Sequence, residues 1–353
     1  MKILIEAMHG LGDTVCMLPT IKAIKLKYPN ARLTILVKYN INKQIIEISK
    51  IKYSELISLN AYSKNIFSTI EKLCYLRKQR FDLAVCCANT PVRKARIFMR
   101  LINPKKVLGI QFEKGISFDD LNDKYHFVDA NFMAIESIVD KDKKCIQPKL
   151  YFDKQTEEKM KQLIEKLTGK IIIGLCIGDA DVSYRNKLLR TDPVFTRGWG
   201  INNMLALIEK LIENGYGVVL LGGRLEERLI KFIPERILNS SNLVNLVNKT
   251  TLKESMALVT LCNIVVGVDT GMMHIADALG VKTISIFGPT NPKTHGAYSK
   301  RARFVEFETE CKYCYGSNMY INCKERKCLK NISVIEVFES IHRLICKNAE
   351  GEL

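Results

Sequence analysis

The chain has 353 residues, of which 47% are hydrophobic and 26% charged, and this balance excludes a disordered or fibrous protein. A single core stops growing near ~250–300 residues, so the length predicts two domains with a cleft between them. The formal charge is +17; residues 1–150 carry 26 Lys and Arg against 14 Asp and Glu. A basic half attracts phosphates, but no zinc finger, helix-turn-helix or RNA-binding aromatic motif supports a nucleic-acid partner.

Short β-branched runs alternate with amphipathic stretches, the pattern of parallel sheets with helices on both faces. In the first half we predict a helix over Thr14–Tyr28 and strands at Lys2–Ala7, Arg32–Lys38, Glu55–Leu59, Asp82–Cys87 and Lys106–Ile110. In the second half we predict helices at Asn202–Glu213, Leu252–Leu261 and Met272–Leu279, and strands at Lys170–Cys176, Gly217–Leu221, Leu243–Leu246, Asn263–Val268 and Lys282–Phe287.

The pattern therefore predicts an α/β protein with two doubly wound, Rossmann-like domains, over residues 1–150 and 151–330. The polar stretch Asp140–Gln147 with Pro148 is the expected linker. The last helix, Val334–Cys346 within residues 331–353, is a candidate to pack back on the first domain.

No apolar run approaches the ~20 residues that cross a bilayer, and Glu6, His9 and Asp13 interrupt the apolar start. We therefore expect a cytoplasmic protein. Its 12 cysteines are then expected to be reduced thiols or metal ligands, because disulfides rarely persist in that compartment.

Ligands of open parallel sheets bind beyond the carboxyl ends of the strands, and the first candidate loop there is His9-Gly10-Leu11-Gly12-Asp13-Thr14. Its two glycines permit a tight turn, and Asp13 either caps the next helix or faces a ligand. Val15 stands where a dinucleotide fingerprint needs a third glycine, so that reading is weak.

Two further loops follow strands of the second half. Asp269-Thr270-Gly271 opens a helix whose unpaired amides and dipole suit a diphosphate. His274 lies one turn deeper on the same face, as a ligand or as a structural residue. The loop Gly222–Glu226 is either an ordinary turn or a place where a ribose lies against Gly222 and Gly223 and donates to Glu226.

Together these motifs resemble the bacterial heptosyltransferases, glycosyltransferase family 9. The resemblance runs from Lys2 to about Ile341 and rests on Gly10-Leu11-Gly12-Asp13, Arg197-Gly198-Trp199, Gly222-Gly223 with Glu226, Asp269-Thr270-Gly271-Met272-Met273-His274, and Phe287-Gly288-Pro289-Thr290. It implies a GT-B fold and inverting transfer of heptose from ADP-heptose to an inner-core acceptor of lipopolysaccharide, in cell-envelope synthesis.

The resemblance also implies residue roles. Asp13 would be the general base, with Gly10 and Gly12 beside the acceptor. The leaving diphosphate would meet Arg197, Thr270 and Gly271, and the sugar and ribose would meet Asp269, His274, Glu226, Gly222 and Gly223.

Since these groups neutralise the diphosphate, no catalytic metal or other cofactor is implied. We interpret Asp179-Ala180-Asp181 as a chance match to the Asp-x-Asp metal signature. The loop from Gly178 to Arg197, with Arg185, Lys187 and Arg190, is longer than in the family, which leaves the sugar and base open.

Two more features stand outside the loops. Thr90–Lys106 is predicted to be a basic amphipathic helix, in which Arg93, Arg96 and Arg100 either are simply solvated or bind a phosphorylated acceptor or the inner face of the membrane. The spacing of Cys311, Cys314, Cys323 and Cys328 is compatible with a structural Zn or Fe site, and equally with reduced thiols or an adventitious disulfide.

Three alternatives stay open. The enzyme could heptosylate protein, or it could use another nucleotide sugar. Outside the enzymes, a phosphate- or nucleic-acid-binding module without turnover would share the basic charge and the amide-rich loops.

Overall fold

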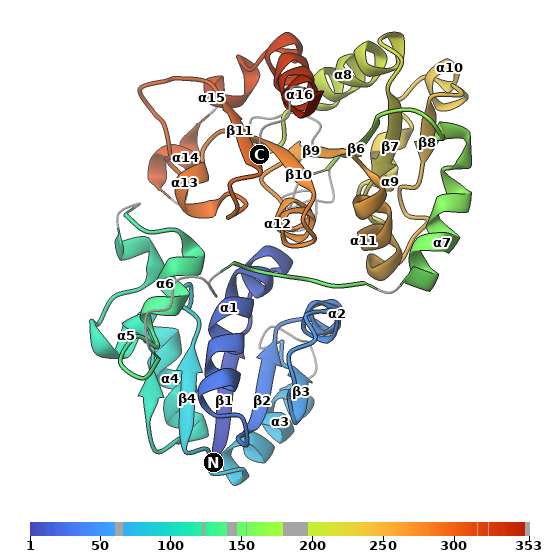
Figure 1. Cartoon of the computed structure of the whole chain (residues 1–353). Helices are drawn as coiled ribbons and strands as arrows, with labels where there is room; N and C mark the ends of the chain where they lie inside the picture. The colour runs from blue at the N-terminus through green and yellow to red at the C-terminus, as the bar shows by residue number, and fades with distance from the viewer. Residues whose placement is uncertain are drawn as a thin grey trace. The chain divides into compact units, whose positions relative to one another are not determined.

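The computed structural model describes residues 1–60, 66–121, 124–139, 147–152, 154–178, 197–315, 317–323 and 325–349. The chain divides into two compact units, Met1–Tyr151 and Phe152–Leu353. Each unit contains one sheet of parallel strands (Figure 1).

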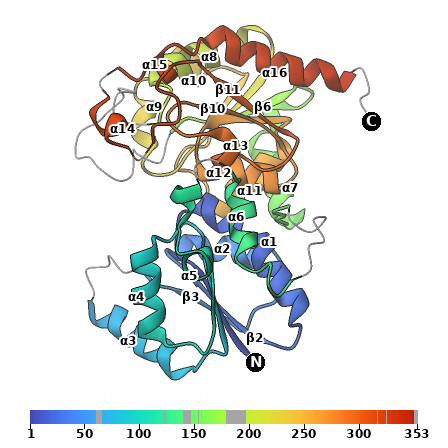
Figure 2. The same ribbon diagram turned by 90° about the vertical axis from the view of Figure 1, so that its left-hand side faces the viewer.

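The N-terminal unit has a five-stranded sheet in the order β3-β2-β1-β4-β5. Its strands are β1 (Lys2–Ala7), β2 (Arg32–Val37), β3 (Glu55–Ser58), β4 (Leu83–Cys86) and β5 (Val107–Leu108). Its helices are α1 (Leu11–Lys27), α2 (Asn40–Ile48), α3 (Ile66–Lys78), α4 (Val92–Ile102), α5 (Ile110–Glu113), a 3-10 helix (Phe118–Leu121) and α6 (Phe127–Met133). Helices α1 and α2 cover one face and α3 and α4 the other (Figure 2), as right-handed crossovers require.

The C-terminal unit has a six-stranded sheet in the order β11-β10-β9-β6-β7-β8. Its strands are β6 (Ile172–Cys176), β7 (Gly217–Leu221), β8 (Leu243–Asn245), β9 (Ile264–Val268), β10 (Lys282–Phe287) and β11 (Ala302–Glu306), the last of which was not predicted. Its helices are α7 (Lys154–Leu163), a 3-10 helix (Glu165–Leu167), α8 (Ile201–Glu213), α9 (Glu227–Ile230), α10 (Glu235–Leu238), α11 (Leu252–Leu261), α12 (Gly271–Ala278), α13 (Pro292–His295), α14 (Asn318–Asn322), α15 (Lys327–Lys330) and α16 (Val334–Ala349).

The strand orders confirm the predicted pair of doubly wound parallel sheets. All registered strand pairs of the described residues are parallel, and the strands are almost entirely buried, because helices exclude water from both faces. In each sheet the order reverses at one place, between β1 and β4 and between β6 and β9. Loops at the carboxyl ends of these strand pairs border the crevice where open sheets bind ligands.

The last helix, α16, lies in the C-terminal unit, which differs from the expectation that it packs back on the first domain. Its apolar side chains Val337, Ile341 and Leu344 join the core formed with β6, β7 and α8. The apolar face is therefore already used within its own unit. Among the described residues, none of the helices combines the length and apolar character needed to cross a bilayer.

Candidate active site

Asp13 lies where the N-terminal sheet reverses its order, at the start of α1. It is the third residue of the helix, and its Oδ2 accepts the backbone N–H of Gly10 at 2.9 Å. This is half of a capping box, since Gly10 has no side chain to return the bond. Asp13 therefore caps the helix, as one interpretation predicted, while its side chain stays partly exposed.

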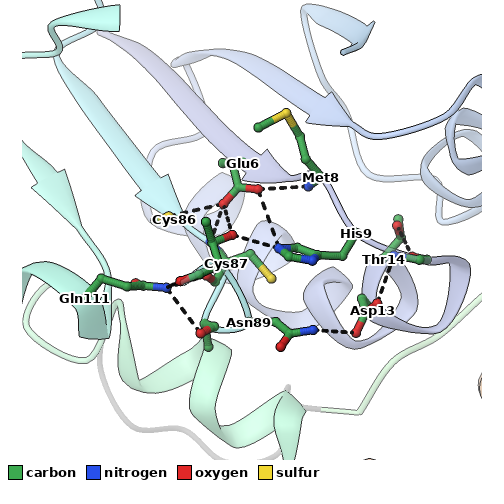
Figure 3. Close-up of polar contacts among 12 residues, drawn as sticks. Glu6, Met8, His9, Asp13, Thr14, Cys86, Cys87, Asn89 and Gln111 are labelled. Atoms are coloured by element: carbon green, nitrogen blue, oxygen red, sulfur yellow. Dashed lines mark hydrogen bonds and ion pairs between the residues drawn. The ribbon is translucent and has the colours of Figure 1, made fainter. Parts of the chain in front are cut away.

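Neighbouring amides fix the turn that carries Asp13 (Figure 3). Asn89, from the loop after β4, approaches the other oxygen of Asp13 with its amide nitrogen 3.4 Å from Oδ1. The buried Asn42 donates to the carbonyls of His9 and Gly10, both at 3.1 Å, and to the Thr14 hydroxyl at 2.7 Å. Both oxygens of Asp13 thus meet neutral donors, and no item of positive charge is spent on them among the printed ion pairs of the described residues.

A second carboxylate, Glu6, lies beneath this turn and is only 1% exposed. Its Oε1 accepts the backbone N–H of Met8 at 3.0 Å. Its Oε2 accepts three donors from β4 and the loop after it: the Cys87 backbone N–H at 3.1 Å, the Thr90 hydroxyl at 2.9 Å and the Cys86 thiol at 3.2 Å. Glu6 therefore ties the loop after β1 to the loop after β4 (Figure 3).

His9 completes this network. Its Nε2 lies 2.8 Å from the Thr90 hydroxyl oxygen and 4.0 Å from Oε1 of Glu6. Because the single proton of Thr90 goes to Glu6, the Thr90 oxygen accepts from His9, which fixes the Nε2–H tautomer. Burial, and after it the charge of Glu6, raises the pKa of the Cys86 and Cys87 thiols well above the usual value, so neither is a candidate thiolate nucleophile.

In the C-terminal unit, Asp269 follows β9, again at the reversal of strand order. It is 7% exposed, and its Oδ2 lies 2.6 Å from Nη1 of Arg197 and accepts the Thr290 hydroxyl at 2.9 Å. Burial alone would raise the pKa of Asp269, but the charges of Arg197, His274 and His295 outweigh it and hold that pKa below its usual value. Asp269 is thus a buried anion paired with arginine.

Thr270 is the N-cap residue of α12. Its hydroxyl oxygen is buried and has no hydrogen-bond partner among the described residues, and it does not cap its own helix. A buried polar atom without a partner is costly unless a ligand or water meets it. With the amide of Gly271 beside it, the helix N-terminus offers donors for an anion.

The loop after β7 is built around Glu226. Its Oε2 accepts the backbone N–H of Gly223 at 2.7 Å. A Cβ at Gly222 would lie 2.8 Å from the Cβ of Glu226, and a Cβ at Gly178 would overlap the same side chain. The glycines therefore make room for Glu226, whereas we had expected them to make room for a ribose.

The predicted basic helix is α4, which is shorter than the stretch Thr90–Lys106. Pro91 precedes it, and Asn103 ends it in a left-handed conformation at φ 57°. Ala95, Met99 and Ile102 are buried, whereas Arg93, Arg96 and Arg100 are exposed.

The four clustered cysteines lie in one region of the C-terminal unit. Burial, and then the neighbouring thiols of Cys314, Cys311 and Cys323, raises the pKa of Cys328 to about 11. Cys323 Sγ accepts the backbone N–H of Arg326 at 3.3 Å. As arranged, the described residues form no group of three or more ligands able to hold a metal ion.

Residues 75–324 match the family model described as glycosyltransferase family 9 (heptosyltransferase), which is more than half of the chain. The chain belongs to glycosyltransferase family 9. The resemblance stated from the motifs is thereby confirmed, and this membership makes the chain a transferase.

Individual members of the family match nearly end to end. The chain is 25% identical over 357 residues to lipooligosaccharide heptosyltransferase 2 of Campylobacter jejuni serotype O:6, covering 98% of this chain and 99% of that one. With the Haemophilus influenzae enzyme of the same name it shares 24% identity over 323 residues, covering 86% and 88%. The structure of E. coli ADP-heptose lps heptosyltransferase II superposes with a TM-score of 0.73 at 19% identity, covering 99% and 100%. The fold is that of GT-B heptosyltransferases.

Sequence reasoning named Asp13, Arg197, Asp269, Thr270 and Glu226, and the structure brings Arg197 together with Asp269. It missed Glu6, Asn89, His295 and Tyr315. A charged Glu6 inside an otherwise apolar strand was the one available signal, since an isolated buried carboxylate needs a reason.

Proposed function

We propose that this glycosyltransferase moves heptose from ADP-heptose to the phosphorylated inner core of lipopolysaccharide, with inversion at the anomeric carbon. The observation that carries the proposal is the partly exposed carboxylate of Asp13, held by neutral donors at the reversal point of the N-terminal sheet. The names of the relatives, which match over almost the whole chain, support the choice of donor and acceptor. Cytoplasmic synthesis is part of the proposal, because nucleotide sugars are made there.

Asp13 would act as the general base. It takes the proton of the acceptor hydroxyl as that oxygen attacks the anomeric carbon and the nucleoside diphosphate departs on the opposite side. Gly10 and Gly12 bring backbone close to the acceptor, and Arg93, Arg96 and Arg100 would meet its phosphates. The neutral hydrogen bonds of Asp13 suit the role, since an ion pair would weaken the base.

The donor side would use the loops of the C-terminal unit. Arg197 and the N-terminus of α12, with Thr270 and Gly271, stabilise the charge that develops on the leaving diphosphate. Asp269 and His274 would hold the sugar or order the loop, and Gly222, Gly223 and Glu226 would meet the ribose. These donors replace a divalent ion, so catalysis is proposed to be metal-independent; Asp179, Ala180 and Asp181 lie outside the described residues, as do Arg185, Lys187 and Arg190.

The test is turnover with purified acceptor. ADP-heptose and a panel of other nucleotide sugars are incubated with the enzyme, a lipopolysaccharide core truncated before heptose, and EDTA, while nucleoside diphosphate release is followed. Release only from ADP-heptose, with the mass of one heptose added to the core, is expected. Addition to protein, use of another sugar, or dependence on a divalent ion would contradict the corresponding part of the proposal.

We also propose that the face formed by α3 and α4 contacts an anionic membrane surface. Phe67, Ile66 and Ile70 on α3 are 86%, 65% and 51% exposed, and Ile97 and Leu101 on α4 are 52% and 48% exposed. Arg77 of α3 donates to the Leu101 carbonyl at 2.8 Å, so the two helices lie side by side. Exposed apolar side chains among arginines are typical of interfacial helices.

Sedimentation with vesicles tests the membrane contact. Binding to phosphatidylglycerol vesicles at low salt should fall when Arg93, Arg96 and Arg100 are all changed to Glu. The matched control is the same charge change at Lys22, Lys50 and Lys52, which line a groove beside α1 in the same unit. Equal loss in both variants would mean that net charge alone, and not this face, decides binding.

The cysteine cluster is proposed to hold a structural Zn or Fe ion, with Cys311, Cys314, Cys323 and Cys328 as ligands. The mutual effect of the four thiols on the Cys328 pKa supports this, because it places them near one another. Metal analysis of protein purified without chelator should give one ion per chain. A chain without metal that melts at the same temperature with and without EDTA would favour plain thiols.

A further inference from the structure

The segment from Cys311 to Cys328 reaches the loops around Arg197 through one aromatic side chain. The ring centre of Tyr315 lies 5.3 Å from the guanidinium carbon of Arg197. The backbone N–H of Tyr315 donates to the Pro289 carbonyl, in the loop after β10, at 2.9 Å. The tyrosine is therefore fixed at its backbone to one strand-end loop while its ring faces the arginine.

Other side chains of the segment brace this ring from behind. Tyr320 meets Tyr315 edge to face, with ring centres 4.9 Å apart. The guanidinium carbon of Arg326 lies 3.9 Å from the centre of the Tyr320 ring, and Arg326 is only 3% exposed. A continuous series of contacts thus leads from a buried arginine in the cysteine cluster to the partly exposed Tyr315.

The backbone shows that this arrangement is specific. Tyr313 and Arg326 have φ values of 59° and 46°, a left-handed region that residues other than glycine rarely occupy. Such conformations persist only where the surrounding structure holds them. The segment is therefore a built element, and its cost must be offset by the contacts it makes.

We propose that Tyr315 is a positioning residue of the donor site, which orients the Arg197 guanidinium toward the diphosphate of the nucleotide sugar. Arg197 is drawn by the carboxylate of Asp269 at one end. A cation–π contact restrains the guanidinium plane on the other side without occupying an N–H donor. The inference rests on the proposed function, because it takes Arg197 as the phosphate ligand.

Calorimetric titration with ADP tests this role. Tyr315→Ala should raise the Kd for ADP about tenfold, within the range of a cation–π contact. Tyr315→Phe should stay within about twofold, because the ring and not the hydroxyl faces the arginine. Phe232→Ala is the matched control, since it removes an exposed ring that Lys231 covers at 5.1 Å, outside the proposed donor site, and it should leave the Kd unchanged.

A double-mutant cycle with Arg197→Ala separates positioning from general damage. If Tyr315 acts through Arg197, adding Tyr315→Ala to Arg197→Ala should cause no further loss of ADP affinity. Additive losses, or wild-type affinity in Tyr315→Ala, overturn the inference. Should the alanine variant fail to fold, Tyr315→Leu keeps the apolar bulk without the π face and should show the same loss. Unchanged ADP affinity in Arg197→Ala would instead overturn the proposed function itself.

Discussion

Asp13 and Asp269 occupy equivalent places in their units, each in a loop between a strand and a helix where the order of the sheet reverses. Asp13 is partly exposed and accepts from Gly10 and Asn89, which are neutral. Asp269 is buried and paired with Arg197. The comparison shows that the environment and not the position assigns the role, because an exposed, unpaired carboxylate can take a proton whereas a buried, paired one can only hold an arginine.

The two loops also differ in how they are anchored. The N-terminal loop is fastened by Glu6, a buried anion that meets backbone, hydroxyl and thiol donors from β4 and the loop after it. The C-terminal loop is fastened by the ion pair itself. Removing the carboxylate of Asp13 should therefore spare the fold, while removing that of Asp269 should not.

The largest effect is expected for Asp13→Asn. Loss of the base should lower kcat by about 10²–10⁴-fold, the usual contribution of general base catalysis. The Kd for ADP and the melting temperature should hardly change, because the amide can still accept from Gly10. Glu47→Asn, at an exposed carboxylate on α2, is the control. A parallel loss of ADP affinity in Asp13→Asn would mean that the residue only shapes the loop.

Asp269→Asn should act on stability first. Breaking a buried ion pair by removing one partner costs roughly 3–5 kcal/mol in the free energy of unfolding, measured here by urea denaturation. ADP affinity should fall as well, since Arg197 loses its anchor. The double variant Asp269→Leu with Arg197→Met should recover stability without recovering ADP binding. Recovery of both would show that neither residue serves the donor.

Glu6→Gln should give an intermediate effect. The new amide places N–H groups against backbone and hydroxyl donors, which costs roughly 1–3 kcal/mol for unsatisfied buried groups. Because Glu6 joins the two loops that hold Asp13, kcat should fall while the Kd for ADP stays constant. Thr90→Val, which removes only the hydroxyl between Glu6 and His9, should give a smaller change of the same kind. A loss of ADP affinity in either variant would contradict this assignment.

The smallest effect is expected in acid. The pKa of Asp269 lies below its usual value of 3.8 in the folded chain, so its contribution to stability is present above that value and is lost as pH falls through the lower folded pKa. Urea denaturation between pH 6 and pH 3 should show wild type losing stability faster below about pH 4 than the Leu and Met double variant. Equal slopes would mean that the ion pair does not shift the titration.

Much of the fold followed from the sequence, because the periodicity of strands and helices is local. β1, β7, β10 and α11 have the predicted bounds, whereas the predicted strand over Lys106–Ile110 is only Val107–Leu108. β11 was missed, since its short run Ala302–Glu306 contains charged residues and resembles a loop.

The site was harder to predict, because its contacts join residues far apart in the chain. Glu6 meets Thr90 only because β4 lies beside β1, and Tyr315 meets Arg197 only after three loops converge. A motif names residues that a family shares, but it says nothing of the side chains that hold them. Such partners require the order of strands in the sheet, which no local pattern contains.

Trp199 illustrates how a single anchor can divide a chain into independent parts. Its ring is 1% exposed, and its indole N–H donates to the Ile332 carbonyl at 2.9 Å. Since Arg197 stands only two residues earlier, the tryptophan sets the register of the arginine from the downstream side. The length and composition of the preceding stretch can therefore diverge among relatives, and with them the preference for the sugar, without displacing the phosphate ligand.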